Sequence, residues 1–363
     1  MIVPFNDLST VNKKINKKIL STIKKNKFIL SNEVSSFEKE FGNFCNAKYV
    51  LGCANGYDAL FLSLKVLNLS KNSEVIIPAM TYAATAYAVI NAGLKLKLVD
   101  VDKNGLIDLD ILEKKINPNT KVIIPVHLYG QPVNMKKLID IKKKYNLKII
   151  EDCAQAHGAF DYTTKKKIGC IGDLACYSFY PGKNLGAIGD AGAIVTNNKN
   201  FYNKLKGFRA LGSKIKYIHN TFGVNSRLDE IQACVLRAKL KSLNIHNNSR
   251  KKIATYYKKN IKSHKDLQII NTTKGSIFHV FNIIVKDRNN LANYLKKKKI
   301  YCVIHYPKSI NQHKYLKNIS NEKFHFAEKL AKNSLSIPIF PFMRKKQIDY
   351  VVKNINNYFN KII

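Results

Sequence analysis

The chain has 363 residues, of which 45% are hydrophobic and 10% aromatic, so it can bury at least one large hydrophobic core. Its net charge of +38 comes almost entirely from lysines spread along the whole chain, whereas phosphate and base recognition rely mainly on arginine. We therefore expect no nucleic-acid partner, although a basic surface would still attract an anionic small molecule.

The sequence also bears on location and thiol chemistry. It contains no uninterrupted apolar stretch long enough to cross a membrane, and its first residues, MIVPFNDLSTVNKK, lack the charged-then-apolar layout of a secretory signal. We expect a soluble, cytoplasmic protein with no membrane partner. The seven cysteines are odd in number and none lies in a C-x-x-C pair, so free thiols and no metal site are expected.

Short apolar runs alternate with longer helical patterns between residues 45 and 200, which is typical of a mostly parallel sheet with crossover helices. Helices are predicted over 58–67 and 135–145. Seven strands are predicted, at residues 48–53, 74–79, 95–102, 121–130, 148–154, 175–180 and 191–197. These elements indicate one large α/β domain, which we place at residues 1–244.

The pattern changes in the last third of the chain. A long helical stretch covers about 229–262, and it is followed by the apolar run 278–286, a helix near 289–299, the run 300–307 and a final helix from about residue 345. This order predicts a smaller α+β domain at residues 245–363. No low-complexity linker separates the two domains, so we expect them to pack closely.

Chemistry-bearing residues follow the predicted strand KIIEDCA. Glu151 and Asp152 end this apolar run, and Gln155 and His157 come soon after. Ligands of open α/β sheets bind at the carboxyl ends of the strands, so Asp152 could hold a metal, a ribose hydroxyl or a protonated ring nitrogen. The alternative is that Asp152 only caps a helix. For His157 we favour a hydrogen-bonded structural role over a catalytic one.

Lys183 stands out among more than fifty lysines because its neighbours in YPGKNLGAIGD are uncharged until Asp190. The flanking strands should bury its amine, which lowers the pKa of a lysine and frees it to form a Schiff base. The nearby glycines allow close backbone approach to a ligand or sharp turns, and they are Gly182, Gly186, Gly189 and Gly192.

The segment GCANGYDAL predicts a strand end, the pair Asn55-Gly56 and a helix beginning near Asp58. Backbone amides at such a helix start bind phosphate well, although Asn-Gly also forms plain turns. A phosphate cradle, a carboxylate and a buried lysine at strand ends of one sheet are together the three contacts that pyridoxal phosphate needs.

Over nearly its whole length the sequence resembles the DegT/DnrJ/EryC1/StrS family of nucleotide-sugar aminotransferases. The motifs that carry the resemblance are VPFNDLS, FILSNEVSSFEKEF, ANGYDAL, PAMTYAAT, PVHLYGQPVNM, IIEDCAQAHGA, SFYPGKNLGAIGDAGAIVTN, FGVNSRLDEIQA and VIHYP. The resemblance implies the fold of the aspartate aminotransferase class, fold type I of the pyridoxal 5'-phosphate enzymes. It also implies a homodimer whose active sites draw residues from both subunits.

The resemblance implies roles around the cofactor ring. Lys183 would bind the cofactor aldehyde as a Schiff base and move the proton in catalysis. Asp152 would pair with the ring nitrogen and keep it protonated. Tyr82 would stack on the ring, with a plain core position as the alternative. Gln155 would lie beside the ring near its phenolic oxygen.

The same resemblance implies contacts at the two ends of the site. The cofactor phosphate would be bound by Gly56, Tyr57 and Ser178 of the same chain and by Asn225 of the partner subunit. The family commonly has threonine where this chain has Tyr57, so we expect a backbone contact there and not a hydroxyl contact. His305 and Tyr306, in the motif HYP, would meet the sugar substrate.

The implied reaction is a ping-pong transamination with L-glutamate as the amino donor. The segment NLGAIGDAGA is similar to the corresponding segment of enzymes that act on 3-keto sugars, whereas enzymes that act on 4-keto sugars tend to have glutamate in place of Asp190. We therefore predict that the acceptor is a dTDP-3-keto-6-deoxyhexose. The product would be a dTDP-3-amino-3,6-dideoxyhexose for a surface glycan, such as O-antigen or lipooligosaccharide.

Several alternatives stay open at this stage. One is an aminotransferase acting on a UDP-linked 3-keto sugar or on a 4-keto sugar. Another is a sugar dehydratase on the same fold, although such relatives often have histidine where this chain has Lys183. A non-catalytic regulator is the third. A dinucleotide-dependent dehydrogenase is disfavoured because GCANGYD does not supply the glycine pattern G-x-G-x-x-G.

Overall fold

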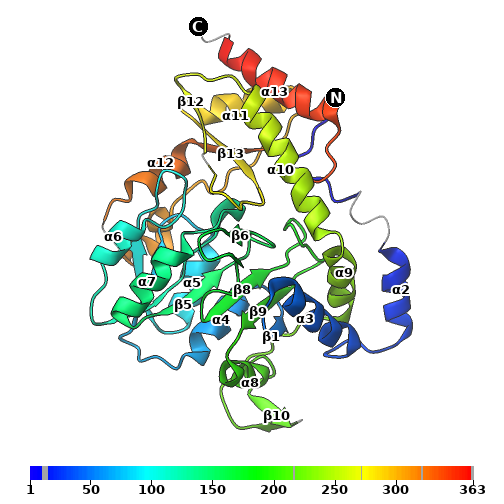
Figure 1. Ribbon diagram of the computed structural model, residues 1–363, viewed down its shortest axis with the longest axis vertical. Helices are drawn as coiled ribbons and strands as arrows, with labels where there is room; N and C mark the ends of the chain where they lie inside the picture. The colour runs from blue at the N-terminus through cyan, green and yellow to red at the C-terminus, as the bar shows by residue number, and fades with distance from the viewer. Residues whose placement is uncertain (10–14, 216, 271, 320–321, 361–363) are drawn as a thin grey trace.

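A seven-stranded sheet forms the centre of the larger part of the molecule (Figure 1). In this computed structural model, residues 1–9, 15–215, 217–270, 272–319 and 322–360 are described. The strand order is β1-β9-β8-β5-β4-β2-β3, and β9 alone runs antiparallel to its neighbours in this sheet. The strands are β1 Tyr49–Cys53, β2 Glu74–Pro78, β3 Lys95–Val99, β4 Thr120–Ile123, β5 Lys148–Asp152, β8 Leu174–Ser178 and β9 Gly192–Thr196. The structure therefore confirms the predicted mostly parallel sheet of seven strands.

The central strands are apolar along their length because both faces of the sheet are covered. Val75, Ile76 and Ile77 of β2 have no exposed surface, and Ile149 and Ile150 of β5 are equally buried. The helices of this part are α2 Asn16–Lys24, α3 Asn32–Cys45, α4 Gly56–Val66, α5 Ala83–Asn91, α6 Leu109–Lys114, α7 Met135–Tyr145, α8 Lys199–Phe208 and α9 Glu230–Leu240. Short elements are η1 Leu128–Gly130, β6 Phe160–Asp161, β7 Lys166–Lys167, β10 Ser213–Ile215 and β11 Ile218–His219.

Helix boundaries follow capping residues. Helix α4 begins two residues before the predicted start, because the side chain of Asn55 accepts a hydrogen bond from the amide of Asp58 at 2.8 Å. Helix α7 has the predicted bounds, with Asn134 as its N-cap and Asn146 in the left-handed conformation at its end. The helical stretch predicted over about 229–262 consists of two helices, α9 and α10 Leu243–Asn260.

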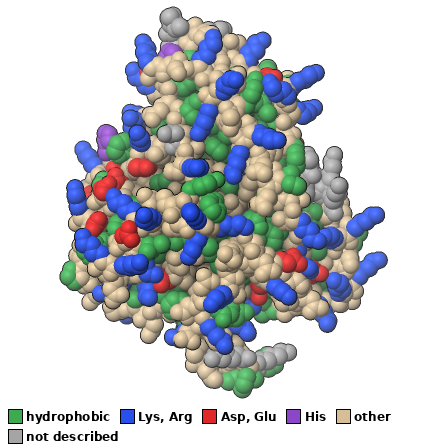
Figure 2. Space-filling model, in the orientation of Figure 1, with side chains coloured by type: hydrophobic (Ala, Val, Ile, Leu, Met, Phe, Trp, Pro, Cys, Tyr) green, Lys and Arg blue, Asp and Glu red, His purple; other side chains and the backbone are tan. Residues whose placement is uncertain are grey.

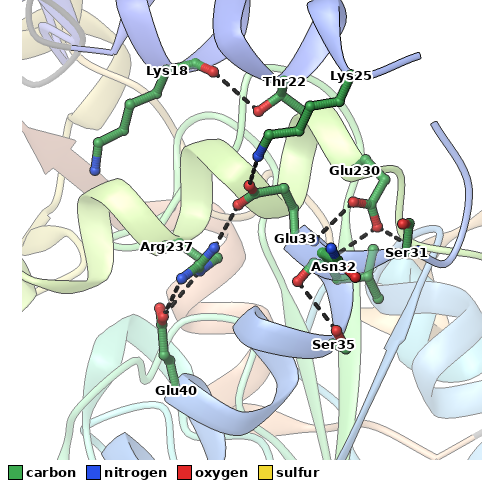
Figure 3. A network of polar contacts seen from close by, with 11 residues as sticks. Lys18, Thr22, Lys25, Ser31, Asn32, Glu33, Ser35, Glu40, Glu230 and Arg237 are labelled. Carbon is green, nitrogen blue, oxygen red and sulfur yellow. Dashed lines mark hydrogen bonds and ion pairs between the residues drawn. The ribbon is translucent and has the colours of Figure 1, made fainter. Parts of the chain in front are cut away.

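A network of charged side chains joins α2, α3 and α9 (Figure 3). The carboxylate of Glu230, the first residue of α9, accepts hydrogen bonds from the amides of Ser31 and Val34 at 2.6 and 3.1 Å. Arg237, two turns further along α9, forms ion pairs with Glu33 and Glu40 of α3. The start of α3 is thus capped by a side chain from another helix and not by its own N-cap residue.

A second, smaller sheet lies in the upper part of Figure 1, above the seven-stranded sheet. Its three strands are antiparallel and have the order β12-β13-β14. The elements of the last third of the chain are α10, β12 Leu267–Ile269, β13 Phe281–Val285, α11 Arg288–Lys297, η2 Ile310–Gln312, η3 Lys314–Ile319, α12 His325–Asn333, β14 Ser334–Ile337 and α13 Lys345–Asn360. The apolar run 300–307 contributes two isolated bridges, Ile300 to Val3 and Val303 to Ser336, and no strand.

The hydrophobic core falls into two clusters. One surrounds the seven-stranded sheet and also includes Ile277, Phe324 and Leu330 from the last third of the chain. The second contains residues between 253 and 359 together with Val3. The boundary between residues 244 and 245 stays a proposal. In the described parts of the chain, no helix combines the length and the apolar character needed to cross a bilayer.

Candidate active site

Asp152 is the last residue of β5 and is buried at the carboxyl end of the sheet. One carboxylate oxygen accepts a hydrogen bond from the hydroxyl of Thr85 at 2.9 Å, and the other accepts one from the amide of Ala154 at 3.1 Å. Burial raises the pKa of Asp152 above its usual range, whereas these hydrogen bonds and the charge of Lys183 favour the ionised form. Pairing with a buried cation would therefore stabilise the ionised form of Asp152.

Lys183 lies in the loop between β8 and β9, and its amide donates a hydrogen bond to the carbonyl of Tyr180 at 2.9 Å. Burial lowers the pKa of its amine to about 8, and the nearby negative charge of Asp152 partly opposes this shift. At pH 7 about a tenth of such an amine is in the unprotonated, nucleophilic form, compared with less than about a thousandth of an ordinary lysine. The structure thus places the predicted lysine and the predicted carboxylate in one electrostatic environment.

Gly56 and Ser178 lie against each other at the start of α4. A Cβ atom at position 56 would stand 2.6 Å from Cβ of Ser178, so only glycine allows this approach. Asn55 caps the amide of Asp58, whereas the amides of Gly56 and Tyr57 belong to the first turn and have no partner within the helix. The helix start and the hydroxyl of Ser178 therefore form a small anion-binding surface.

Tyr57 does not offer its hydroxyl to this surface. Its phenol accepts a hydrogen bond from the side-chain amide of Asn91 at 2.6 Å, at the far end of α5. The ring packs against the large core, with its centre 6.2 Å from that of Phe61. The geometry fits the expectation that position 57 contributes its backbone alone.

Tyr82 and Gln155 lie on either side of Tyr306. The ring centres of Tyr82 and Tyr306 are 5.7 Å apart, and Tyr82 is 62% exposed, so the alternative of a plain core position is wrong. The amide group of Gln155 donates to the hydroxyl of Tyr306 at 2.9 Å and accepts from the amide of Tyr129 at 2.7 Å. Gln155 thus fixes the tip of Tyr306 near the carboxyl end of β5.

His305 is held by both its ring and its backbone. Nδ1 lies 2.9 Å from the hydroxyl of Ser336, and the carbonyl oxygen accepts a hydrogen bond from the hydroxyl of Tyr129 at 2.7 Å. Burial, and next the charge of Lys183, lower the pKa of His305 to about 4. The imidazole is therefore neutral at physiological pH, and Tyr306, whose pKa is raised by burial, keeps its proton.

Asn225 is exposed, and in the described parts of this single chain no hydrogen bond joins it to the other predicted site residues. Its neighbour Ser226 donates to the carboxylate of Asp58 at 2.7 Å and accepts from the amide of Ala54 at 3.1 Å. The structure thus brings nine of the ten predicted residues to the carboxyl ends of the strands and leaves Asn225 facing outward. Its predicted action on a partner subunit stays a prediction.

Three residues near the site were not predicted from the sequence. Thr85 binds the carboxylate of Asp152, and it lies one helical turn after Tyr82, which is a signal that the motif TYAAT did offer. Tyr129 contacts Gln155 and His305. His279 lies beside the residue that follows Lys183, with Nδ1 3.0 Å from the side-chain oxygen of Asn184. It comes almost a hundred residues later in the chain, so no local pattern indicated it.

His157 is buried between the rings of Tyr177 and Phe179, whose centres lie 5.4 and 5.5 Å from its own. In the described structure neither ring nitrogen has a partner at full hydrogen-bond geometry, but an interaction with the backbone of Ser178 acts to raise the pKa of the imidazole. Its backbone carbonyl does accept a hydrogen bond from Asn247 at 2.8 Å. Burial lowers the pKa of the imidazole to about 3, which keeps it neutral and compatible with its aromatic surroundings.

His127, Glu151 and Cys153 bring metal-ligand atoms within 4.8 Å of one another. Glu151, however, accepts hydrogen bonds from three amides, those of Gly169, Ile171 and Gly172, and lies 3.2 Å from Nε2 of His127. Nδ1 of His127 accepts the amide of Val133 at 3.1 Å, so Nε2 carries the proton that Glu151 accepts. Because the His127 and Glu151 atoms are already engaged, we interpret this group as a structural support behind Asp152.

The surface carries many cations. Figure 2 shows Lys and Arg side chains spread over the whole visible face, with Asp and Glu groups between them. The net charge of +38 therefore acts as a broad positive field. Such a field raises the encounter rate with an anionic substrate.

The fold and the site together define an α/β protein with a lysine, a carboxylate and an anion-binding helix start gathered at the carboxyl ends of one sheet. The chain belongs to the DegT/DnrJ/EryC1/StrS aminotransferase family, which matches residues 9–356. This match confirms the family that the sequence motifs indicated.

Relatives match most or nearly all of the chain. It is 41% identical to the dTDP-3-amino-3,6-dideoxy-alpha-D-galactopyranose transaminase of Aneurinibacillus thermoaerophilus, over 98% of this chain and 99% of that protein. A UDP-N-acetyl-3-dehydro-alpha-D-glucosamine 3-aminotransferase from Acidithiobacillus ferrooxidans is 39% identical, over 88% and 87%.

Solved structures agree. DesV from S. venezuelae has a TM-score of 0.95 at 33% identity, covering 98% of both chains. NtdA from Bacillus subtilis, solved with bound PMP as its cofactor, has a TM-score of 0.90 at 28% identity, covering 99% of this chain and 85% of that one.

Proposed function

We propose that the chain is a pyridoxal-phosphate-dependent aminotransferase that transfers the amino group of L-glutamate to the 3-keto carbon of a dTDP-3-keto-6-deoxyhexose. The product would be a dTDP-3-amino-3,6-dideoxyhexose. The observation that carries the proposal is the pair of Lys183, partly buried and with a pKa of about 8, and the buried Asp152, set beside a helix start that can bind an anion. Similarity over 98% and 88% of the chain to two transaminases named for amination at carbon 3 supports it.

The residues of the site fit the cofactor. Its phosphate would be bound by the amides of Gly56 and Tyr57 and by the hydroxyl of Ser178. Because Gly56 has no Cβ, which would clash with Ser178, the backbone at this position stays open to the phosphate. Asp152 would pair with the protonated ring nitrogen. When bound, the cofactor supplies an electron-accepting ring that stabilises negative charge on the carbon that loses a proton.

The protein residues have separate tasks in the reaction. The amine of Lys183 would hold the cofactor aldehyde until the amino group of glutamate replaces it. The freed amine would then take the proton from the α-carbon of glutamate and later return a proton to carbon 3 of the sugar. Its lowered pKa suits this exchange near neutral pH. Tyr82, exposed at the start of α5, would cover one face of the ring and exclude water. The neutral imidazole of His305 and the phenol of Tyr306 would contact the sugar.

The substrate is tested by offering purified enzyme and glutamate four acceptors in parallel: dTDP-linked 3-keto, dTDP-linked 4-keto, UDP-linked 3-keto and GDP-linked 4-keto sugars. Product mass and NMR spectra then identify the aminated carbon. We expect the dTDP-linked 3-keto sugar to react fastest. Preferred amination at carbon 4, or preferred use of the UDP-linked sugar, would contradict the substrate assignment while leaving the aminotransferase intact.

A simpler measurement separates the aminotransferase from its rivals. The visible absorption band of the cofactor-loaded enzyme should disappear on addition of glutamate. A non-catalytic regulator would keep the band under the same conditions. A sugar dehydratase would be recognised instead by a sugar product that has lost a hydroxyl group and gained no nitrogen.

We also infer a homodimer. Five exposed apolar side chains surround β10 and β11, and they are Leu211, Ile215, Tyr217, Ile218 and Phe222. Exposed apolar patches of this kind mark association surfaces. When a second copy of the chain covers this hairpin, Asn225, which follows β11, would reach the phosphate end of the site in the other copy.

The cellular role follows from the product. We place the reaction in the cytoplasm, since all seven cysteines are free, as is usual in a reducing compartment. The amino sugar would enter a surface glycan such as O-antigen or lipooligosaccharide. Deleting the gene in its host should remove the 3-amino sugar from the surface polysaccharide, and complementation with the Lys183→Ala variant should not restore it.

A further inference from the structure

Tyr129 contacts three separate parts of the site through three different groups. Its amide donates to the side-chain oxygen of Gln155 at 2.7 Å, and its carbonyl accepts from the amide of His279 at 3.0 Å. Its hydroxyl donates to the carbonyl of His305 at 2.7 Å. These partners come from the end of β5, from the segment before β13 and from the loop that carries Tyr306.

The backbone at this position is unusual. Tyr129 has φ +62 and ψ +11, a left-handed conformation that a bulky residue rarely adopts, and Gly130 follows with φ +83. A Cβ at position 130 would lie 3.0 Å from the carbonyl of Gln155 and 3.0 Å from the amide of His279. The turn therefore packs tightly between Gln155 and the segment 277–279. Strained backbone conformations of this kind are often found at functional sites.

The surroundings of the phenol are buried and polar. Tyr129 is 2% exposed, and its pKa is raised by burial, so the hydroxyl stays a donor. Asn282 of β13 and Ser334 of β14 lie next to it. Asn282 also accepts a hydrogen bond from Ser336, whose hydroxyl lies 2.9 Å from Nδ1 of His305. The phenol thus belongs to the same small-domain cluster that holds the ring of His305.

The contacts of Tyr129 lead to Tyr306 by two routes. Gln155 is held by the amide of Tyr129, and its other end donates to the hydroxyl of Tyr306. The carbonyl of His305, one residue before Tyr306, is held by the phenol of Tyr129. Tyr129 therefore fixes Tyr306 from two sides, at its tip through Gln155 and at its backbone through His305.

We propose that Tyr129 is a positioning residue that sets the His305–Tyr306 pair against Gln155, so that binding of the sugar nucleotide depends on its hydroxyl. The proposal rests on the proposed function, in which His305 and Tyr306 meet the sugar. Glutamate, which is much smaller than the sugar nucleotide, does not need this pair to be aligned. The reaction with the keto-sugar is thus the sensitive half.

The test is Tyr129→Phe, measured in separate half-reactions of the cofactor-loaded enzyme. Rapid-mixing absorbance with glutamate should give rates within about twofold of wild type, whereas the apparent Kd for the keto-sugar nucleotide should rise about tenfold, as expected for losing one buried hydrogen bond. Calorimetric binding of the dTDP-amino sugar to the pyridoxamine phosphate form of the enzyme, where no carbonyl group is present to react with it, provides a readout independent of turnover and should show the same loss.

Tyr257→Phe is the matched control. The hydroxyl of Tyr257 is also buried and donates to a carbonyl, that of Pro338, at 2.8 Å, but it lies in the second core away from the site. It should leave both half-reactions unchanged. Equal losses in the two variants, or a Tyr129→Phe enzyme that binds the sugar nucleotide like wild type, would overturn the proposal.

A double variant keeps the test independent of folding effects. Tyr306→Phe alone should weaken sugar binding, and adding Tyr129→Phe should weaken it by much less than the product of the two single effects, because both act on one group. Multiplicative effects would count against the proposal. A wild-type enzyme that loses no absorption band with glutamate would instead contradict the proposed function itself.

Discussion

At the scale of single residues, two lysines have the same lowered pKa for different purposes. Burial brings the pKa of both Lys183 and Lys239 to about 8. Lys239, on α9, donates to the carbonyl of Gly186 at 2.7 Å and so anchors the loop that carries Lys183. Lys183 instead lies in the field of Asp152. A low pKa alone therefore does not identify the reactive amine, and its neighbours do.

This difference leads to a prediction about cofactor capture. When cofactor-free protein is mixed with pyridoxal phosphate, the rate of covalent attachment should rise about tenfold per pH unit below pH 8 and level off above it, because only the unprotonated amine reacts. Rapid-mixing absorbance measures the rate. Borohydride reduction and peptide mapping should then find the pyridoxyl group on Lys183 and not on Lys239.

The Lys183→Ala variant should bind the cofactor without covalent attachment and should not turn over. Lys239→Met should keep the attachment at Lys183, at a slower rate if the anchored loop becomes mobile. A pyridoxyl group mapped to Lys239 or to any other lysine in wild type would refute the site assignment.

At the scale of elements, α9 organises the region around the lysine loop. Its first residue, Glu230, caps α3 by accepting the amides of Ser31, Glu33 and Val34. Its first turn also holds the loop after Lys183, since the side chain of Gln232 accepts the amide of Ile188 at 3.0 Å. One helix thus contacts both α3 (Figure 3) and the loop that carries Lys183.

Glu230→Gln should therefore destabilise the protein clearly. The carboxylate is 2% exposed and satisfies three amides, so replacing it should lower the free energy of unfolding by about 2 kcal/mol. Urea unfolding followed by circular dichroism measures the change. Glu40→Gln, which removes a half-exposed ion pair between the same two helices, should cost under about 1 kcal/mol. Equal effects of the two substitutions would show that the buried cap is not what docks α3.

At the scale of the whole molecule, the sequence indicated the sheet and the core of the site for physical reasons. Buried parallel strands are continuous apolar runs, and the carboxyl ends of such strands meet, so Asp152 and Lys183 were placed together correctly. Tyr129 and His279 could not be found this way. Their roles depend on a left-handed turn and on docking of the small domain, which are set by contacts between residues far apart in the chain.

The last prediction concerns the assembly of two chains into a dimer. Asn225 faces outward in the single chain, so its proposed contact with a cofactor phosphate must be made in the site of a partner. The Lys183→Ala variant should be inactive, and Asn225→Asp should be nearly so, because a carboxylate would repel the phosphate. Mixing the two variants by joint unfolding and refolding should restore activity. Each mixed dimer then contains one site with both defects and one site with neither.

The recovery should approach about a quarter of wild-type activity, since random pairing makes about half of the dimers mixed and each of these has one intact site. Light scattering should show dimers for the wild type and both variants, and refolded wild type sets the reference for activity. If Asn225 acted within its own chain, every site in the mixture would carry a defect and no activity would return. The same mixing experiment therefore tests the dimer, the shared site and the placement of Asn225 together.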